Sequence, residues 1–425
     1  MQRALAEART IHVSDNSNMF VILGANITSS ATAYAEYNAT KEPDYLAFFD
    51  VLDKFDGRLH PQVLFTLARL CGYPKVQYYA SITPPEHSRA VLGTFQQRCV
   101  SYLEKTLDFK IPTEMLHSRY GMGMPDYVTN AHRLYNASFA FATRQCPVQQ
   151  PVSLVTDLPE GNFAGSTAYQ AAQASAQWLF YNTTSPETIL RPQEFQLAMA
   201  IRCGTVTSNI MTVINTRGVT CGCNERARTA QDLIDHALVC RHNPYCPTKR
   251  HTEVKNSVAA CLRRHDFHIS VEPTNYIHLY NNGKQQRPDI AVYGNMTIAT
   301  DFVISQQHDK PGDAAHAAAE KKNDTHKEAV SKAGDLFIPY SLEAHGYAHS
   351  CCETFSKAIT ETRTPLDARD IRRELAHVVS IALARARVRA VLGLVNDEFD
   401  NLDQFSRPDF RHRHGTGGDT YNMAA

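Results

Sequence analysis

The chain has 425 residues, of which 43% are hydrophobic, and its 43 basic and 43 acidic side chains cancel. This length and apolar content exclude an intrinsically disordered chain and allow two or three packed domains. The zero net charge excludes a uniformly basic nucleic-acid binder, although residues 240–265 hold six Lys or Arg against the single acid Glu253. We find no apolar signal peptide and no apolar run of 18 residues, so neither a secreted nor a membrane protein is expected and the eleven cysteines are expected to be reduced.

Residues 1–148 are predicted to form a helical region, because apolar side chains recur at helical spacing between prolines. The pattern is clearest in Tyr45, Phe48, Phe49, Leu52 and Phe55. From residue 149 the chain becomes rich in Ala, Ser, Thr, Gln and Pro. Residues 149–215 are therefore expected to be a linker or a loosely packed helical layer.

Residues 216–248 carry the side chains of a metal site. Cys221 and Cys223 lie on a tight turn and are followed by His236 and Cys240. A helix through the second half would place His236 and Cys240 one turn apart, at positions i and i+4. Two thiolates facing a His/Cys pair make a tetrahedral zinc site, so a CCHC zinc knuckle is predicted here.

A capping box predicts where this helix begins, since Thr229 is followed three residues later by Asp232. Two alternatives to the four-ligand set remain open at this point. His242 or Cys246 lies close enough in sequence to replace one ligand, or the group is an ordinary set of buried cysteines with a surface histidine.

Residues 249–350 show a specific order of elements. Hydrophobic periodicity, prolines and turn residues predict a helix, three strands, a second helix and a fourth strand. The expected ranges are 251–264 for the first helix, 267–272, 289–293 and 297–305 for the strands, 313–333 for the second helix and 336–340 for the last strand. A polar turn at 281–283 and a hairpin turn at Gly294-Asn295 separate the strands.

Two acids lie on neighbouring strands of this predicted hairpin. Asp289 opens one strand and Asp301 lies inside the next, between Ala299 and Phe302. A carboxylate in an apolar segment is costly to bury unless it is compensated. Mg²⁺ or Mn²⁺ is the simplest compensation, because hard cations bind carboxylate oxygens and act on phosphates. Glu272 is either a further metal-facing acid or a solvated carboxylate at a strand end.

This element order, with the Pro288-Asp289 pair and Asp301, resembles the restriction-endonuclease-like nuclease fold with its PD…(D/E)xK motif. The residue two positions after Asp301 is Val303 rather than lysine. Related nucleases take the cation from the following helix, and the resemblance then implies that Lys322 or Lys327 replaces it.

A wider resemblance is to the C-terminal part of non-LTR retrotransposon reverse transcriptase proteins of the restriction-like-endonuclease class. The matching segments are Arg250-His251, Glu272-Pro273, Arg287-Pro288-Asp289 and Asp301 after the knuckle, with weaker matches at Val21–Asn26, His60-Pro-Gln, Thr83–Glu86 and Tyr120–Pro125. The implied fold class is multidomain, an α front plus α/β: a helical thumb-like region, a small zinc knuckle at 216–248, an αβββαβ endonuclease core at 249–350 and a helical tail at 351–400. The polar residues 401–425 are expected to be disordered.

The resemblance implies a metal-dependent nuclease that nicks target DNA in the nucleus to prime reverse transcription. Its candidate catalytic residues are Asp289, Asp301, Lys322, Lys327 and Glu272, with Asp289 and Asp301 holding Mg²⁺ or Mn²⁺. Its candidate nucleic-acid-binding residues are Lys249, Arg250, His251, Lys255 and Arg287. Element RNA or an intact reverse transcriptase would be further partners. Because no aromatic-x-Asp-Asp polymerase motif is found, the chain is expected not to polymerise DNA, as in a truncated copy or a gene model that begins after the palm.

Two other classes of function compete with this reading. A degenerate element would bind nucleic acid through zinc without cleaving it, and the missing lysine at Val303 favours that class. A scaffold protein would instead associate through the helix predicted from Asp367 to Val395. Its apolar stripe is formed by Ile371, Leu375, Val378, Val379, Ala382, Leu383 and Ala386.

Overall fold

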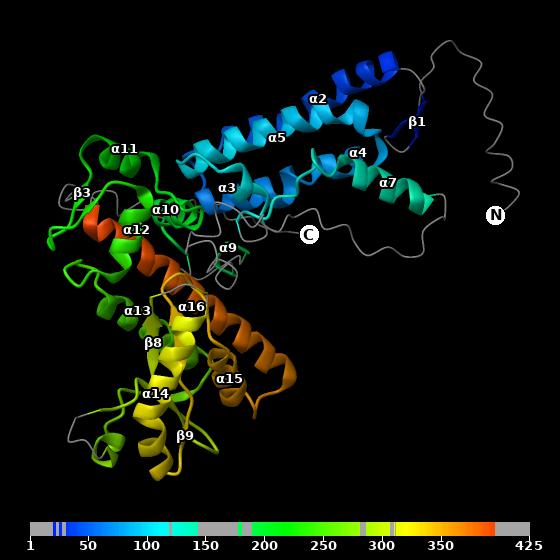
Figure 1. Ribbon diagram of the computed structural model, residues 1–425. Coiled ribbons are helices and arrows are strands. Elements are labelled where there is room, and N and C mark those ends of the chain that lie inside the picture. The colour runs from blue at the N-terminus through cyan, green and yellow to red at the C-terminus, as the bar shows by residue number, and fades with distance from the viewer. Residues whose placement is uncertain are drawn as a thin grey trace, which may run out of the picture.

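The chain is mostly helical, with a few small sheets, in the computed structural model (Figure 1). Within the described residues there are two large hydrophobic cores, one beneath the front helices and one beneath the α/β unit, and a third, smaller cluster between α14 and the sheet. The structure describes residues 20–22, 25–27, 31–118, 121–142, 177–180, 189–280, 286–306, 310 and 312–395. The predicted tail at 401–425, the polar turn at 281–283 and most of the predicted linker lie outside these residues.

The front region is a group of packed helices that follows a short hairpin of β1 (Phe20–Ile22) and β2 (Ala25–Ile27). The predicted helical spacing is confirmed from Tyr45 to Leu52, which lie on α2 (Ala31–Asp53), but Phe55 lies beyond the end of α2 and is exposed. Helices α2 and α5 (Pro85–Leu107) run side by side (Figure 1). Phe49 packs against Phe95 and Tyr102 between them. The other elements are α3 (Pro61–Leu67), a π-helical turn η1 (Ala68–Gly72), α4 (Lys75–Ile82), α6 (Thr113–His117) and α7 (Ala131–Ala142).

The segment predicted as a linker or a loose layer contains well-packed helices where the structure describes it. These are α9 (Gln177–Phe180), α10 (Pro192–Arg202) and α11 (Ser208–Arg217). In α10 every residue from Leu197 to Arg202 is buried. Residues 192–202 are therefore part of the front core and not a linker, because their apolar side chains fill it.

The Cys/His unit (residues 219–240) is a small hairpin followed by a helix. Strands β3 (Val219–Thr220) and β4 (Arg226–Ala227) pair antiparallel, and α12 (Ala230–Val239) follows. The predicted capping box is confirmed, since Thr229 accepts a hydrogen bond from the backbone N–H of Asp232 and the Asp232 side chain accepts one from Thr229. Helix α12 buries Leu233, Ile234, Ala237 and Leu238 in the front core.

The α/β unit (residues 247–343) has the predicted order of elements. It comprises α13 (Pro247–Arg264), β5 (His268–Val271), a 3₁₀-helix η3 (Thr274–Leu279), β6 (Ile290–Tyr293), β7 (Ile298–Thr300), β8 (Phe302–Ser305), α14 (Asp313–Lys332), β9 (Leu336–Phe337) and β10 (Tyr340–Glu343). The main sheet has the order β5-β6-β7-β9, with β7 and β9 parallel and the other pairs antiparallel.

The predicted strand 297–305 is interrupted at Asp301, and the predicted strand 336–340 is interrupted opposite it. Strands β8 and β10 continue the parallel pairing of β7 and β9, with Phe302 beside Tyr340. The Asp301 carbonyl accepts a hydrogen bond from the Tyr340 N–H at 3.0 Å. Pro339 has no N–H to offer to the ladder at the break. The break lets Asp301 lie in the strand position without being part of a regular ladder.

Two C-terminal helices complete the fold, α15 (Ser350–Ile359) and α16 (Pro365–Val395). Helix α16 runs from the α/β unit to the Cys/His unit (Figure 1). Buried residues in its middle, between Leu375 and Leu383, belong mainly to the α/β core. Its C-terminal part, from Ala384 to Val395, belongs to the front core, as does Ile381. All seven residues of the apolar stripe are buried within the chain. That stripe is consequently not available for the self-association that a scaffold would need. Among the described helices, none is both long and apolar enough to cross a membrane.

Candidate active site and zinc centre

The four predicted zinc ligands converge on one point. The Cys221 and Cys240 sulfurs lie 3.4 Å apart, Cys223 Sγ lies 3.3 Å from His236 Nε2, and Cys240 Sγ lies 3.7 Å from Cys223 Sγ. A tetrahedral zinc with bonds of about 2.0–2.3 Å would hold such atoms about 3.5–3.8 Å apart. The Cys₃His group can therefore hold a metal ion, and its geometry is compatible with zinc.

Local structure explains this convergence. The backbone N–H of Cys221 bonds to the Glu225 carbonyl and Asn224 adopts a left-handed φ of 69°, so the turn brings both thiols to one side. Helix α12 ends at Cys240, whose N–H still bonds to the His236 carbonyl at 3.0 Å. Burial raises the pKa of the Cys221 thiol to about 11, a cost that a metal would offset by holding the thiolate.

The alternative ligands are not part of this group. His242 is exposed, and Cys246 is the residue before α13, where the backbone N–H of Lys249 lowers the pKa of the thiol. A second cluster of ligand atoms, from Cys261, His265 and Glu374, is already closed. Glu374 accepts hydrogen bonds from Arg264 and His265 at 2.9 and 2.8 Å. We assign no metal to that cluster.

The two predicted acids face each other across β6 and β7. The register pairs Ile290 with Thr300, so the next positions outward are Asp289 and Asp301. The N–H of Asp289 bonds to the Thr300 carbonyl at 3.0 Å, which fixes the acid at the end of the ladder. Cross-strand neighbours have Cβ atoms about 5 Å apart. Both residues are buried, with exposures of 9% and 5%.

Asp289 is held by hydrogen bonds from two elements. Its Oδ2 accepts from the backbone N–H of Phe302 at 2.8 Å and from His251 Nε2 at 2.9 Å. Lys255 Nζ lies 3.7 Å from Oδ1. The hydrogen bond to Asp289 raises the pKa of His251 against the opposing effect of burial, so the acid favours the protonated imidazole.

Asp301 is held by side chains of α14. Its Oδ2 forms an ion pair with Lys322 and lies 3.4 Å from His326 Nε2. Burial alone would raise the pKa of this carboxyl, but the contact with His326 and the charge of Lys322 outweigh it, and the pKa is lowered. Neither contact has hydrogen-bond geometry, so within the described residues this buried oxygen has no hydrogen-bond partner. An incompletely satisfied buried oxygen is a feature expected of a ligand site.

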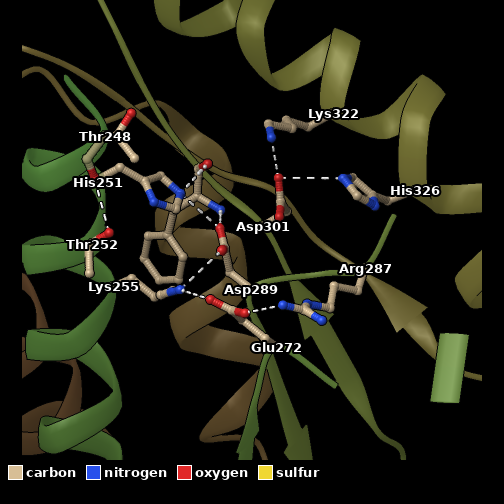
Figure 2. A network of polar contacts seen from close by, with 11 residues as sticks. Thr248, His251, Thr252, Lys255, Glu272, Arg287, Asp289, Asp301, Lys322 and His326 are labelled. Atoms are coloured by element: carbon tan, nitrogen blue, oxygen red, sulfur yellow. Dashed lines mark hydrogen bonds and ion pairs between the residues drawn. The ribbon is translucent and has the colours of Figure 1, made fainter. Parts of the chain in front are cut away.

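Each acid is thus flanked by one histidine and one lysine that are four residues apart on a helix (Figure 2). His251 and Lys255 come from α13 and approach Asp289. Lys322 and His326 come from α14 and approach Asp301. Residues at i and i+4 lie on the same face of a helix, so each helix presents one such pair to the sheet. We call these residues and the two acids the acid site.

Glu272 acts as the counter-ion of the acid site rather than as a ligand facing it. Its carboxylate accepts a hydrogen bond from Lys255 at 2.6 Å and also pairs with Arg287 (Figure 2). These hydrogen bonds lower the pKa of Glu272. The backbone at Glu272 has a φ of +52°, and its N–H bonds to the Asp289 carbonyl at 2.7 Å. A left-handed φ at a non-glycine residue costs about 1 kcal/mol or more, and residues with such backbone strain are commonest near functional sites.

The remaining predicted residues divide between surface and interior. Lys327 is exposed, whereas Lys322 forms an ion pair with Asp301 in the acid site. Lys249 and Arg287 are exposed and can meet a phosphate. Arg250 is 3% exposed and donates a hydrogen bond to the Leu238 carbonyl at 3.0 Å. The assignment of Arg250 to nucleic-acid binding is therefore wrong, because its guanidinium joins α13 to the end of α12.

The side chains of the acid site fit a hard divalent cation. Asp289 and Asp301 offer carboxylate oxygens from adjacent strands, and one of these oxygens lacks a hydrogen bond. No third acid converges with them within the described part of the chain, since Glu272 is bound to cations instead. Two carboxylates and several waters are the usual ligands of Mg²⁺. Lys255 and Lys322 neutralise the acids in this structure, and a metal would compete with them.

Sequence reasoning missed His326 and Tyr280. His326 is four residues after Lys322, so the helical spacing could have found it once Lys322 was chosen. Tyr280 follows the 3₁₀-helix η3, which was not predicted, and no local pattern pointed to it.

A comparison with models of protein families and a search of curated proteins both find no match.

Proposed function

We propose that this chain is a metal-dependent DNA endonuclease derived from a non-LTR retrotransposon, which nicks target DNA to prime reverse transcription. The observation that supports it best is the acid site. Two buried carboxylates lie at the ends of adjacent strands in an αβββαβ unit, and each is matched by a lysine and a histidine. Buried acids with paired cations at the ends of adjacent strands are suited to chemistry on a phosphodiester.

In this proposal Asp289 and Asp301 hold Mg²⁺ or Mn²⁺, which when bound supplies a Lewis acid for the phosphate and for the attacking water. The chain's own side chains position and neutralise. Lys322 has a side chain that is 28% exposed, so it can contact both Asp301 and a phosphate. His251 is held by Asp289 at 2.9 Å and by the Phe302 carbonyl at 3.1 Å, and its side chain is 28% exposed, so it can meet a substrate beside Asp289. These cations stabilise the negative charge that builds up on the phosphate.

The Cys/His unit supplies affinity in this proposal. Its metal stabilises the hairpin and α12, which lie next to the exposed Lys249 at the start of α13. Target DNA is the substrate, and element RNA or a complete reverse transcriptase supplied separately are further partners. The chain would act in the nucleus. Binding through phosphates falls steeply with salt, so affinity should decrease as salt is raised.

The test is nicking of supercoiled plasmid by the purified chain with Mg²⁺ or Mn²⁺. Asp289→Asn and Asp301→Asn keep the side-chain shape and remove the charge, and we expect each to lower the nicking rate about 1,000-fold. Asp324→Asn is the matched control, because Asp324 is an exposed acid on α14. Nicking that survives both substitutions would locate the activity elsewhere.

A wild-type chain that does not nick would contradict the nuclease proposal. If DNA binding were then retained, lost on zinc removal and unchanged by Asp289→Asn, the chain would be a binding relic of the element. The missing lysine at Val303 is the feature that favours this second candidate.

A further inference from the structure

His326 connects the acid site to a residue of a different element. It lies on α14 one turn after Lys322 and is 4% exposed. Its Nε2 lies 3.4 Å from Asp301 Oδ2, and its Nδ1 lies 2.6 Å from the hydroxyl of Tyr280. The ring is also packed between the rings of Tyr280 and Phe337, with centroid separations of 5.6 and 5.3 Å. Polar contacts and packing therefore fix both the place and the rotation of this imidazole.

One nitrogen of the ring faces a carboxylate and the other faces a hydroxyl. An ionised carboxylate can only accept, so the nitrogen that faces Asp301 must carry a hydrogen. A neutral ring with its hydrogen on Nε2 has a lone pair on Nδ1, and the Tyr280 hydroxyl can donate to it. Burial and the charge of Asp301 raise the pKa of Tyr280 to about 12, which keeps this hydroxyl protonated. The Tyr280 hydroxyl therefore bonds to Nδ1 at 2.6 Å, and Nε2 faces the Asp301 carboxylate in an ion-pair contact at 3.4 Å.

We propose that Tyr280 and His326 are positioning residues, which orient the Asp301 carboxylate for the metal. This inference rests on the proposed nuclease function. The acid gains a fixed orientation from a ring that is itself fixed, as hydrogen-bonding partners do behind many metal ligands.

Burial separates the role of His326 from that of its counterpart on α13. The His251 side chain is 28% exposed and can meet a substrate. The His326 side chain is 5% exposed, so it cannot touch DNA and acts only through Asp301. The two histidines thus carry different roles, because His251 is partly exposed and His326 is enclosed by Tyr280 and Phe337.

The test measures the Mn²⁺ concentration for half-maximal nicking and, separately, Mn²⁺ binding by calorimetry. We expect His326→Ala to raise the Mn²⁺ concentration for half-maximal nicking and the Kd for Mn²⁺ about 10- to 100-fold. His326→Gln, whose amide can donate to Asp301, should recover most of the loss. Tyr280→Phe should weaken Mn²⁺ binding several-fold, and should have no further effect in the His326→Ala background. Tyr276→Phe is the control, because Tyr276 lies in the 3₁₀-helix just before Tyr280 but its hydroxyl bonds to Asp335 at 2.7 Å.

Equal Mn²⁺ binding by wild type and His326→Ala would overturn the inference, as would equal losses in Tyr276→Phe and Tyr280→Phe. NMR of ¹⁵N-labelled histidines in the metal-free chain gives a readout that needs no nuclease activity. A hydrogen on Nε2 of His326 is expected, and a hydrogen on Nδ1 alone would overturn the inference. A chain that binds Mn²⁺ with these differences and does not nick would contradict the proposed nuclease and leave the positioning role supported.

Discussion

The Cys/His unit and the acid site treat their candidate ligands in opposite ways. In the Cys/His unit, three sulfurs and one imidazole nitrogen lie within 3.3–3.7 Å of their neighbours, and no cation or acid separates them. In the acid site, each carboxylate is already matched by a lysine and a histidine. A closed set of four protein ligands is typical of a structural metal, whereas acids that exchange partners suit a metal that must admit substrate.

The two sites also differ in how far apart their parts lie along the chain. The four Cys/His ligands come from one hairpin and one helix, within a span of 19 residue steps. The acid site joins α13, two strands and α14, from His251 to His326. The first site can form as soon as its own segment folds. The second depends on the assembly of the whole α/β unit and is therefore the more sensitive to changes elsewhere.

The largest effect should come from breaking the Cys/His unit. Cys240→Ser removes one of four ligands, and we expect the chain to lose its zinc and the unit to unfold, because structural zinc contributes on the order of 10 kcal/mol to its local fold. Native mass spectrometry and hydrogen exchange of residues 219–240 measure this. Cys71→Ser, at an exposed cysteine, should change neither readout. Retained zinc in Cys240→Ser would show that the ligand set is different.

The next effect separates the two lysines that sequence alone left open. Lys322→Ala should lower the nicking rate about 100-fold, the usual effect of removing one group that stabilises charge. Lys327→Ala should leave the rate within about twofold, the size of a surface change, because Lys327 is exposed and the ion pair with Asp301 is made by Lys322. Plasmid nicking at saturating Mn²⁺ compares them directly. Equal losses would mean that general surface charge, and not the acid site, governs the reaction.

Local patterns predicted much of this chain. The capping box at Thr229, the one-turn spacing of His236 and Cys240, and the apolar strand after Asp289 all depend on neighbours in sequence. The order of helices and strands in the α/β unit followed from the same kind of pattern. The pairing of Asp289 with Asp301 was also accessible, because a tight hairpin fixes the register of its strands.

Features that depend on distant partners could not be predicted in this way. Arg250 was assigned to DNA because it is basic and lies in a basic segment. Its burial arises from α12 and from α16, which is more than a hundred residues later in the chain. The break at Asp301 lies opposite the break between β9 and β10, which contains Pro339. Contacts of these kinds are properties of the assembled fold and leave no mark on local periodicity.

The buried Arg250 links the α/β unit, through α13, to α12 of the Cys/His unit. Its removal tests whether the stabilities of these two units are coupled. Arg250→Met keeps the length and packing of the side chain but leaves the Leu238 carbonyl without its donor, which should destabilise the chain by about 2 kcal/mol. Arg241→Met, at an exposed position, is the control. Urea unfolding measures the difference. We also expect hydrogen exchange to rise at both ends of the link, in α12 and in the first turn of α13. Faster exchange in α12 alone would mean that the regions are independent.

The smallest effect is on the pH dependence of the free energy of unfolding. It distinguishes acid loss of zinc from acid destabilisation of the fold. His345 is 2% exposed, and burial together with the charges of Arg387 and Arg250 lowers its pKa to about 3. A histidine whose folded pKa lies below its unfolded value stays neutral in the fold. Its contribution is complete above pH 6.5 and is lost as pH falls, by about 1.4 kcal/mol at pH 5.5.

His345→Gln should remove this share of the pH dependence, whereas acid release of zinc from His236 should persist in wild type and variant alike. Urea unfolding at pH 7.5 and 5.5, with zinc content measured in parallel, separates the effect of His345 protonation from the effect of zinc release. An identical slope in both proteins would assign the whole acid response to the Cys/His unit. A smaller slope in the variant would place part of that response between the two regions, where α16 carries Arg387 and the Arg387 guanidinium donates a hydrogen bond to the His345 carbonyl at 2.9 Å.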